Sequence, residues 1–280
     1  MKFGFSAAAL MASAMLFSAG AVGAQVVDGD LSDLGTALTV QTEAPSFGAS
    51  MYVDAIYLKD TPNNVYIGIE GDSSFNNHFI VLIDVASRTG DSAAPVPSSS
   101  SAGALSGGDF VGSTLELPQV DFGFSGNSGD NNNSTNGGGN DASFYLDFLD
   151  YTTAGNTGSF QGTDAVVDNG TDASQIVAAS GIVFAYSDND TSGTGGNQQG
   201  LEIMIPKTVL GITGGTSIQI FAALTGGSGF FSSSVLPPVT GRGAVNIGVD
   251  PNFTTLAGTQ ATTASAISPA SVSEWMTLSD

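Results

Sequence analysis

YVDAIYLKDTPNNVYIGIEG, residues 52–71, consists of two alternating runs joined by a polar segment. In the second run apolar Val65, Ile67 and Ile69 occupy every other position, which predicts a strand with one buried face. Pro62 and two asparagines separate the runs, and these residue types favour a turn. The stretch therefore predicts a β-hairpin.

Strand patterns of this kind recur along the chain. HFIVLIDV (78–85) is nearly all apolar and is typical of a central strand. PKTVLGI, with Pro206 at its start and Gly211 near its end, predicts one short helical turn. We therefore predict an all-β fold, a single jelly-roll-like β-sandwich of about ten antiparallel strands with one short helix. The other expected strands are 38–43, 113–124 (one or two short strands), 142–151, 175–188, 201–206, 216–225 and 272–278.

The first 24 residues have the features of an export signal. Lys2 is followed by an apolar stretch and then by Val22-Gly23-Ala24, small residues of the kind that a signal peptidase reads. We expect a signal peptide at 1–24 and a β-sandwich domain at 25–280, secreted or at the cell surface, extracellular or periplasmic. No later stretch approaches about 18 consecutive apolar residues, so no membrane span is expected after signal removal.

Three polar stretches are expected to be loops. Residues 86–108 are rich in Ser, Gly, Ala and Pro, and 125–141 contain no apolar side chain, so both are predicted to be flexible surface loops. Residues 228–241 are predicted to form a loop held by apolar anchors.

The charge is strongly one-sided, with 26 acidic and 5 basic residues and a net charge of −21. This balance excludes nucleic acid as a partner, because phosphate binding needs clustered Lys and Arg. The chain has no cysteine, so it has no disulfide to stabilise it outside the cell. The acidity has two explanations, solubility in a salty habitat or the binding of divalent cations.

Several segments resemble family 9 carbohydrate-binding modules and exported bacterial β-sandwiches of that kind. VVDGDLSDLG (26–35) is similar to their Asp-Gly-Asp opening, 53–85 to their next three strands, and 200–224 to a later strand and turn. FFSSSVLPPV (230–239) and PNFTTLAGTQ (251–260) resemble uncharacterised exported members. The resemblance implies a β-sandwich that binds extracellular or cell-surface glycan.

Sugar-binding members of that family usually present tryptophans to the glycan. Here Trp275 is the only tryptophan, and it lies outside the matched region. A glycan site must therefore use tyrosines, or be absent, and the six tyrosines are Tyr52, Tyr57, Tyr66, Tyr145, Tyr151 and Tyr186. The predicted carbohydrate-binding residues are Tyr57, Tyr66, Tyr145 and Tyr151.

Calcium is the cation that the acidic loops suit, because it takes six to eight oxygen ligands from carboxylates, amides and carbonyls. The predicted ligands are Asp28 and Asp30 in one loop, and Asp188 and Asp190 in another. No loop matches the full twelve-residue calcium motif, since the closing glutamate is missing. The resemblance favours Asp28 and Asp30, because the opening acidic segment of that family often lies beside a metal. The alternative for 188–190 is a solvated hairpin connection.

Catalysis is not expected. His78 is the only histidine, and we interpret it as a strand-end residue with no reaction role rather than the base of a Ser-His-Asp triad. Glu70 and Glu202 lie on the polar faces of predicted strands, and we interpret them as part of solvated faces rather than a glycosidase pair.

Two functions stay open ahead of a third, a divergent glycoside-active enzyme, which is the least favoured. The first is a non-catalytic glycan-binding sandwich, stabilised by calcium. The alternative is a structural surface protein, such as an S-layer, matrix or filament subunit, that self-associates through exposed strand edges. A face with two or more exposed tyrosines would favour the first function, and a long unpaired edge strand would favour the second.

Overall fold

The computed structural model describes residues 25–48, 51–73, 77–90, 120–128, 143–152, 157–164, 167–168, 175–188, 198–213, 216–226, 230–238, 243–248 and 276–277. The predicted signal peptide, most of the two predicted flexible loops, Asp190 and Trp275 lie outside these residues.

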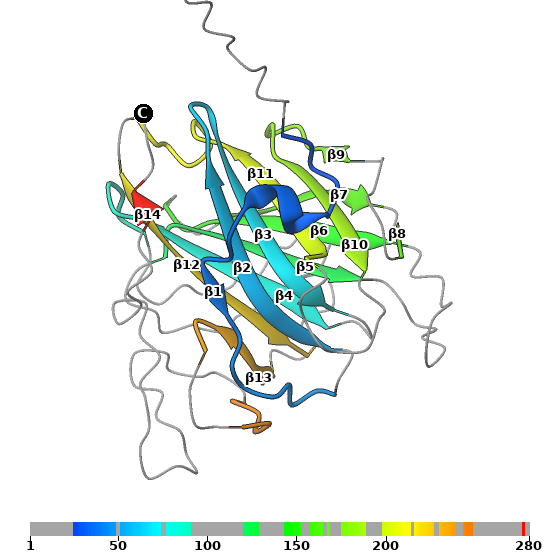
Figure 1. Cartoon of the computed structure of the whole chain (residues 1–280). Helices are drawn as coiled ribbons and strands as arrows, with labels where there is room; N and C mark the ends of the chain where they lie inside the picture. Colours follow the sequence, from blue (N-terminus) through cyan, green and yellow to red (C-terminus); the bar gives the residue numbers. More distant parts are fainter. Residues whose placement is uncertain are drawn as a thin grey trace, which may run out of the picture.

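Two β-sheets pack face to face (Figure 1). The first has the order β1-β2-β3-β11-β10-β8, and β9 also pairs with β10. Its strands are β1 (Thr39–Val40), β2 (Tyr52–Asp60), β3 (Asn64–Asp72), β8 (Val167–Asp168), β9 (Ile176–Val177), β10 (Val183–Asp188) and β11 (Gly200–Pro206).

The second sheet has the order β13-β12-β4-β5-β6-β7, and β14 also pairs with β12. Its strands are β4 (His78–Val85), β5 (Phe122–Ser128), β6 (Phe144–Asp150), β7 (Thr157–Asp164), β12 (Ser217–Thr225), β13 (Phe231–Leu236) and β14 (Met276–Thr277). All pairings are antiparallel except β8 with β10. The predicted all-β sandwich is confirmed.

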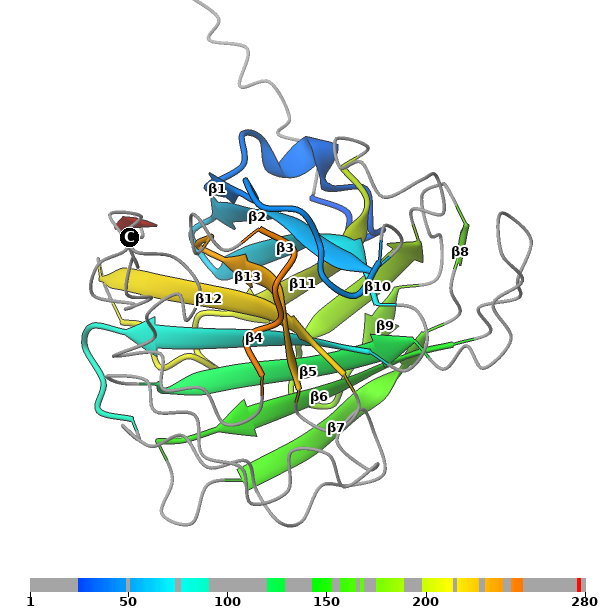
Figure 2. The ribbon, with the colours of Figure 1, turned by 90° about the horizontal axis from the view of Figure 1, so that it is seen from below.

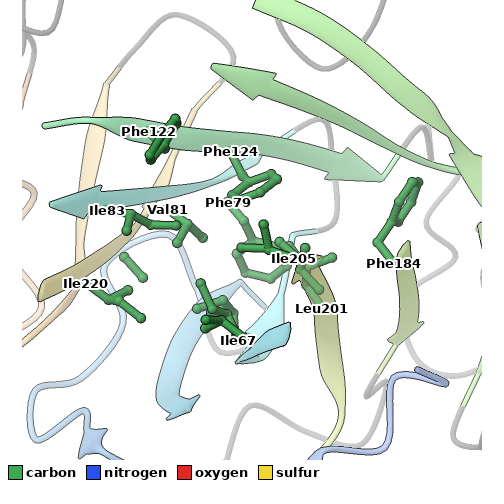
Figure 3. Packing of buried hydrophobic residues seen from close by; sticks show 14 of the residues in the cluster. Ile67, Phe79, Val81, Ile83, Phe122, Phe124, Phe184, Leu201, Ile205 and Ile220 are labelled. Carbon is green, nitrogen blue, oxygen red and sulfur yellow. The ribbon is translucent and has the colours of Figure 1, made fainter. Parts of the chain in front are cut away.

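The main core lies between the two sheets (Figure 3). Val65, Ile67 and Ile69 of β3 are fully buried in it, as their alternation predicts. Phe79, Val81 and Ile83 of β4 reach it from the opposite sheet. Because each sheet buries one face here, register is fixed, since a one-residue slip would turn these side chains outward.

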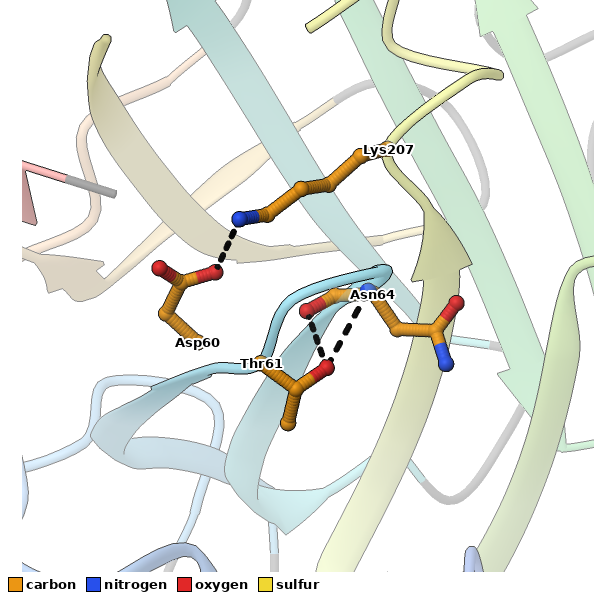
Figure 4. Close-up of polar contacts among 4 residues, drawn as sticks. All are labelled: Asp60, Thr61, Asn64 and Lys207. Atoms are coloured by element: carbon orange, nitrogen blue, oxygen red, sulfur yellow. Dashed lines mark hydrogen bonds and ion pairs between the residues drawn. The ribbon is translucent and has the colours of Figure 1, made fainter. Parts of the chain in front are cut away.

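The hairpin predicted at 52–71 is present, with β2 ending at Asp60 and β3 beginning at Asn64. Thr61 closes the turn, because its Oγ1 donates to the Asn64 carbonyl at 2.9 Å and accepts from the Asn64 N–H at 3.1 Å (Figure 4). Lys207 Nζ lies 2.9 Å from Asp60 Oδ1 and ties this turn to the end of β11.

Two predicted elements differ in the structure. Residues 207–211, within the segment predicted to be helical, form a turn, and within the described residues the only helical segment is the 3₁₀ helix η1 (Leu31–Leu34). Residues 231–236, predicted as loop, form β13, whose side chains are all buried. Serines at 232–234 conceal this strand in the sequence.

Two predicted boundaries also move. The long strand expected at 175–188 is a hairpin of β9 and β10, because a turn at Ala178 closes through a Gly181 N–H to Ala178 carbonyl bond of 2.9 Å. Residues 125–128, expected to belong to a polar loop, instead continue β5. Gly126 fits there because an added Cβ would lie 2.4 Å from the Phe144 ring.

The two lateral sides of the sandwich differ. On one side β13 contacts β2, and Ser233 bonds to the 44–46 segment through Ser46 Oγ at 2.7 Å and the Ala44 carbonyl at 2.9 Å. On the other side β7 is the outermost strand of the second sheet. Only its last residues reach across, where Asp164 Oδ2 accepts from the Tyr186 N–H at 3.1 Å.

Candidate functional site

The acidic opening of the domain forms a strap, residues 25–34, across the outer face of the first sheet (Figure 2). Asp28 Oδ1 accepts from the Asp30 N–H at 3.1 Å, and Asp30 Oδ1 accepts from the Ser32 N–H at 3.0 Å. Asp30 is thereby the N-cap of η1. The Asp-Gly-Asp pattern thus has a local structural role, since two Asx turns start the 3₁₀ helix.

Gly29 allows the strap to approach β10 closely. Its φ is +77°, and a Cβ there would lie 2.7 Å from the Ser187 backbone nitrogen. The left-handed conformation and the lack of space both require glycine. The strap therefore passes directly over the end of β10, where Asp188 follows Ser187.

Beneath the strap lies a socket, formed by Ala55, Tyr57, Tyr66, Gly68, Val183 and Ala185. Val27, Leu31 and Leu34 of the strap are buried against it. A Cβ on Gly68 would lie 2.7 Å from Leu34 Cδ1 and 2.9 Å from Leu31 Cδ2, so glycine leaves the space that the two leucines fill.

Two glutamates lie buried on the same face as the socket. Glu202 is fully buried, and its Oε2 accepts from the N–H groups of Asp28 at 2.9 Å and Gly29 at 3.3 Å. Glu70 accepts from the Tyr57 hydroxyl at 2.8 Å and from the Gln198 N–H at 3.2 Å. The solvated face predicted for these two glutamates is therefore wrong, because the strap and the 198–200 segment cover it.

Burial changes the proton affinity of these groups. It raises the pKa of Glu202 to about 8, against the lowering effect of the Asp28 N–H, while Asp33 nearby raises it further. Burial and the bond to Glu70 raise the pKa of Tyr57 to about 12. Glu202 is thus largely protonated at neutral pH. The strap N–H groups favour the charged carboxylate, but the burial that raises the pKa of Glu202 outweighs them.

The tyrosines predicted to bind carbohydrate lie on different faces. Tyr57 and Tyr66 are in the socket, with exposures of 4% and 6%, and Tyr151 is 4% exposed on the outer face of the second sheet. Tyr145 on β6 is the one member that is only half-buried. The four residues do not form one surface, and only Tyr145 is open to a sugar ring in this conformation.

The predicted calcium ligands come from two neighbouring segments. Asp28 and Asp30 are half-buried in the strap, and the Asp188 backbone lies at the end of β10 beneath it. Asp190 and the Asp188 side chain lie outside the described residues. Across the described ranges, no group of three or more His, Cys, Asp or Glu side chains is arranged to hold a metal ion. Calcium binding stays a prediction.

His78 lies beside a serine on the outer face of the second sheet. Its Nδ1 is 3.4 Å from Ser125 Oγ, and Ser125 pairs with Asp147 on the next strand. The serine thus stands between the histidine and the aspartate, whereas a triad needs the histidine in the middle. Burial lowers the pKa of His78 to about 4, so the ring is neutral at pH 7.

The sequence pattern missed β7. Its residues Thr157, Ser159, Phe160 and Thr163 are exposed, and Phe160 is 38% exposed. Within 157–164 there is no lysine, arginine or proline, the residues that commonly blunt an edge strand. The one sequence signal for a strand here is the run of Thr, Ser, Phe and Gln at 157–161, and it is too weakly apolar to show alternation.

Comparisons with protein-family models, curated proteins and solved structures found no match for this chain. No helix in the part of the chain that the structure describes is long and apolar enough to cross a membrane.

Proposed function

We propose that the protein is an exported, non-catalytic structural subunit of the cell surface that joins copies of itself through the β7 edge. The observation that carries this proposal is the outermost position of β7 among the described strands of its sheet, together with the exposure of Thr157, Ser159 and Phe160. A strand at a sheet edge presents a row of backbone N–H and C=O groups, which a strand of another chain can pair with.

The exposed part of the edge lies mainly in its first half, at Thr157, Ser159 and Phe160. The second half of β7 begins at an irregularity opposite Leu146 and Asp147, and Gln161 Oε1 accepts from Ser180 Oγ at 2.7 Å. A bulge of this kind interrupts regular pairing. Residues 157–160 are therefore the segment that would meet its equivalent in a second copy, in an antiparallel, two-fold arrangement.

Charge sets the conditions for this association. The net charge of −21 makes two copies repel each other, and salt or a divalent cation screens that repulsion. We therefore expect assembly to strengthen with ionic strength and with calcium. The predicted calcium ligands Asp28 and Asp30 are half-buried and available to test by their asparagine variants.

A single introduced cysteine tests the edge, because the chain has no cysteine of its own. Under mild oxidation Ser159→Cys should form a covalent dimer, since a two-fold axis beside Ser159 brings the two equivalent Cα atoms within about 6 Å. Ser87→Cys is the matched control, because Ser87 is exposed in the turn after β4. Dimers that form equally in both variants, or in neither at concentrations where the unmodified protein assembles, would overturn the proposal.

Glycan binding is the second candidate, and a specific observation favours it. Phe160 lies opposite Asp147, two residues along the same face of β6 from half-buried Tyr145. Two accessible rings beside polar groups are a common platform for a sugar ring. The resemblance to family 9 carbohydrate-binding modules supports the same ligand class.

A glycan array separates the two candidates. Glycan binding that Tyr145→Ala and Phe160→Ala abolish, in a protein that stays monomeric with and without calcium, would favour this second candidate over the structural subunit. Large assemblies without glycan binding would favour the structural subunit.

A further inference from the structure

The strap is held as a docked peptide rather than as part of either sheet. Its backbone bonds run to the 198–202 segment: the Leu31 N–H donates to the Gln198 carbonyl at 2.7 Å, and the Gly29 carbonyl accepts from the Gly200 N–H at 3.2 Å. Glu202 adds the two bonds to the Asp28 and Gly29 N–H groups. Main-chain bonds that supply affinity and side-chain pockets that supply register are how an extended peptide binds a folded domain.

The six socket residues lie on β2, β3 and β10. β11 lies between β3 and β10 in the same sheet, and its pairings with both strands are continuous ladders, whereas the β2–β3 ladder has an irregularity between Val53 and Ala55. The shape that receives Leu31 and Leu34 therefore exists whichever chain supplies the strap.

The strap leaves its socket at an open hinge. Gly35 has a φ of +98°, with no atom within 4 Å of the position a Cβ would take, and Thr36 is exposed. After the short β1, a further segment at 41–51 precedes β2. Rotation at this hinge would redirect the strap without disturbing the sheet, which is the usual requirement for exchanging an element between identical chains.

We propose that the socket of one copy receives the strap of a second copy. The inference rests on the proposed structural role and adds a second contact to it. Val27, Leu31 and Leu34 would make the same contacts in the socket of a second copy as in their own. Exchange therefore changes only which chain supplies the strap and the effective concentration of strap near each socket. Because the donor and acceptor surfaces differ, repeated exchange is head-to-tail and extends an assembly beyond the two-fold pairs that the β7 edge allows.

Two variants test the exchange, one that can only donate its strap and one that can only accept a strap. Gly68→Val fills the socket, because even its Cβ would overlap both leucines, but leaves the strap intact, so it is a donor only. Leu31→Asp keeps the socket but places a charge where an apolar side chain is fully buried, so it is an acceptor only. Both carry Ser159→Lys to block the β7 edge.

Each variant alone should elute as a monomer, and an equimolar mixture should give a new peak of one-to-one heterodimer by size exclusion with light scattering. A mixture that stays monomeric overturns the exchange. Far-ultraviolet circular dichroism must show β structure in each variant. If Gly68→Val is unfolded, binding of a synthetic 25–34 peptide to the Leu31→Asp protein replaces the mixture, and no binding at millimolar peptide overturns the proposal.

The experiments distinguish failure of the β7 edge contact from failure of the strap exchange. Loss of cross-linking at Ser159→Cys with an intact heterodimer in the mixture would refute the edge contact and keep the exchange. The reverse result would refute exchange and keep the edge.

Discussion

β3 and β7 are strands of similar length in opposite surroundings. β3 has nine residues, eight of them buried, because the core lies on one face and the strap on the other. β7 has eight residues, four of them exposed, and pairs with β6 on one side. The apolar residues of this protein are thus concentrated in the interior strands, and a polar, nearly uncharged strand lies at the edge.

The largest expected difference between the two strands is in stability. Ile67 of β3 is fully buried, so Ile67→Ala should lower the free energy of unfolding by about 2–5 kcal/mol, through lost burial and a cavity. Ser159→Ala on β7 should change it by less than about 0.5 kcal/mol. Urea unfolding measures both, and similar values for the two variants would break the comparison.

The next largest effect on stability is expected on the face of β3 that the strap covers. Gly68→Ala should lower the free energy of unfolding by about 1–3 kcal/mol, because the new methyl overlaps Leu31 and Leu34. Leu31→Ala makes room for that methyl, so the double variant should lose less than the sum of the two single changes. Simple additivity in this cycle would show that the leucines do not fill the space at Gly68.

The covered face also predicts a pH dependence. The pKa of Glu202 in the folded protein is about 8 against an ordinary value of 4.5, so the folded state keeps a proton that the unfolded state has lost between these pH values. Stability should therefore fall as pH rises from 4.5 to 8, by at most about 1.4 kcal/mol per pH unit. Glu202→Gln keeps an oxygen for the strap and removes the titration. Its stability measured by urea unfolding should lack this decline, and parallel pH curves would contradict the assignment.

The second sheet predicts a trend of opposite sign over a narrower range. His78 has a pKa of about 4 when folded against 6.5 ordinarily, so the unfolded state binds the extra proton between these values. Stability should fall as pH drops from 6.5 to 4, by at most about 1.4 kcal/mol per pH unit. The melting temperature of His78→Asn should fall less between pH 6.5 and pH 4 than that of the unmodified protein. An equal fall in both proteins would refute the role of His78.

The smallest effect on stability belongs to the variant with the largest expected effect on assembly. Ser159→Lys places an exposed charge on the β7 edge and should change the free energy of unfolding by less than about 0.5 kcal/mol. It should nevertheless abolish edge-mediated assembly, because lysine on an edge strand opposes pairing with another strand. Analytical ultracentrifugation measures assembly, and urea unfolding measures stability. A Ser159→Lys monomer with a clearly lower free energy of unfolding would contradict the expectation that β7, unlike β3, contributes little to stability.

Alternation was enough to predict the interior of the fold. Val65, Ile67 and Ile69 on β3, and Leu201, Ile203 and Ile205 on β11, face the core as the sequence indicates. β2 departs from strict alternation, because an irregularity between Val53 and Ala55 returns Val53 to the core side. Such a bulge depends on the partner strand and leaves no trace in local periodicity.

Edges and covered faces were beyond the sequence pattern. β7 and the serine-rich β13 have too few apolar residues to show a period of two, and their strand conformation depends on pairing with β6 and β12. Glu70 and Glu202 alternate along their strands as solvent-facing residues would, but the strap, 174 residues away at Asp28, covers Glu202, and the 198–200 segment covers Glu70. The sequence located Asp28 and Asp30 in a special loop without revealing that Glu202 binds the backbone N–H groups of Asp28 and Gly29.

The separation of 174 residues between Asp28 and Glu202 has a consequence for the order of folding. A ribosome makes the strap early and β11 late, so the strap has no complete socket during most of synthesis. Contacts this distant in sequence also form slowly, because a long loop must close first. We therefore expect a newly made chain to pass through a period in which its strap is free beside finished neighbours, and crowding at the site of release, rather than affinity, to decide whose socket it enters.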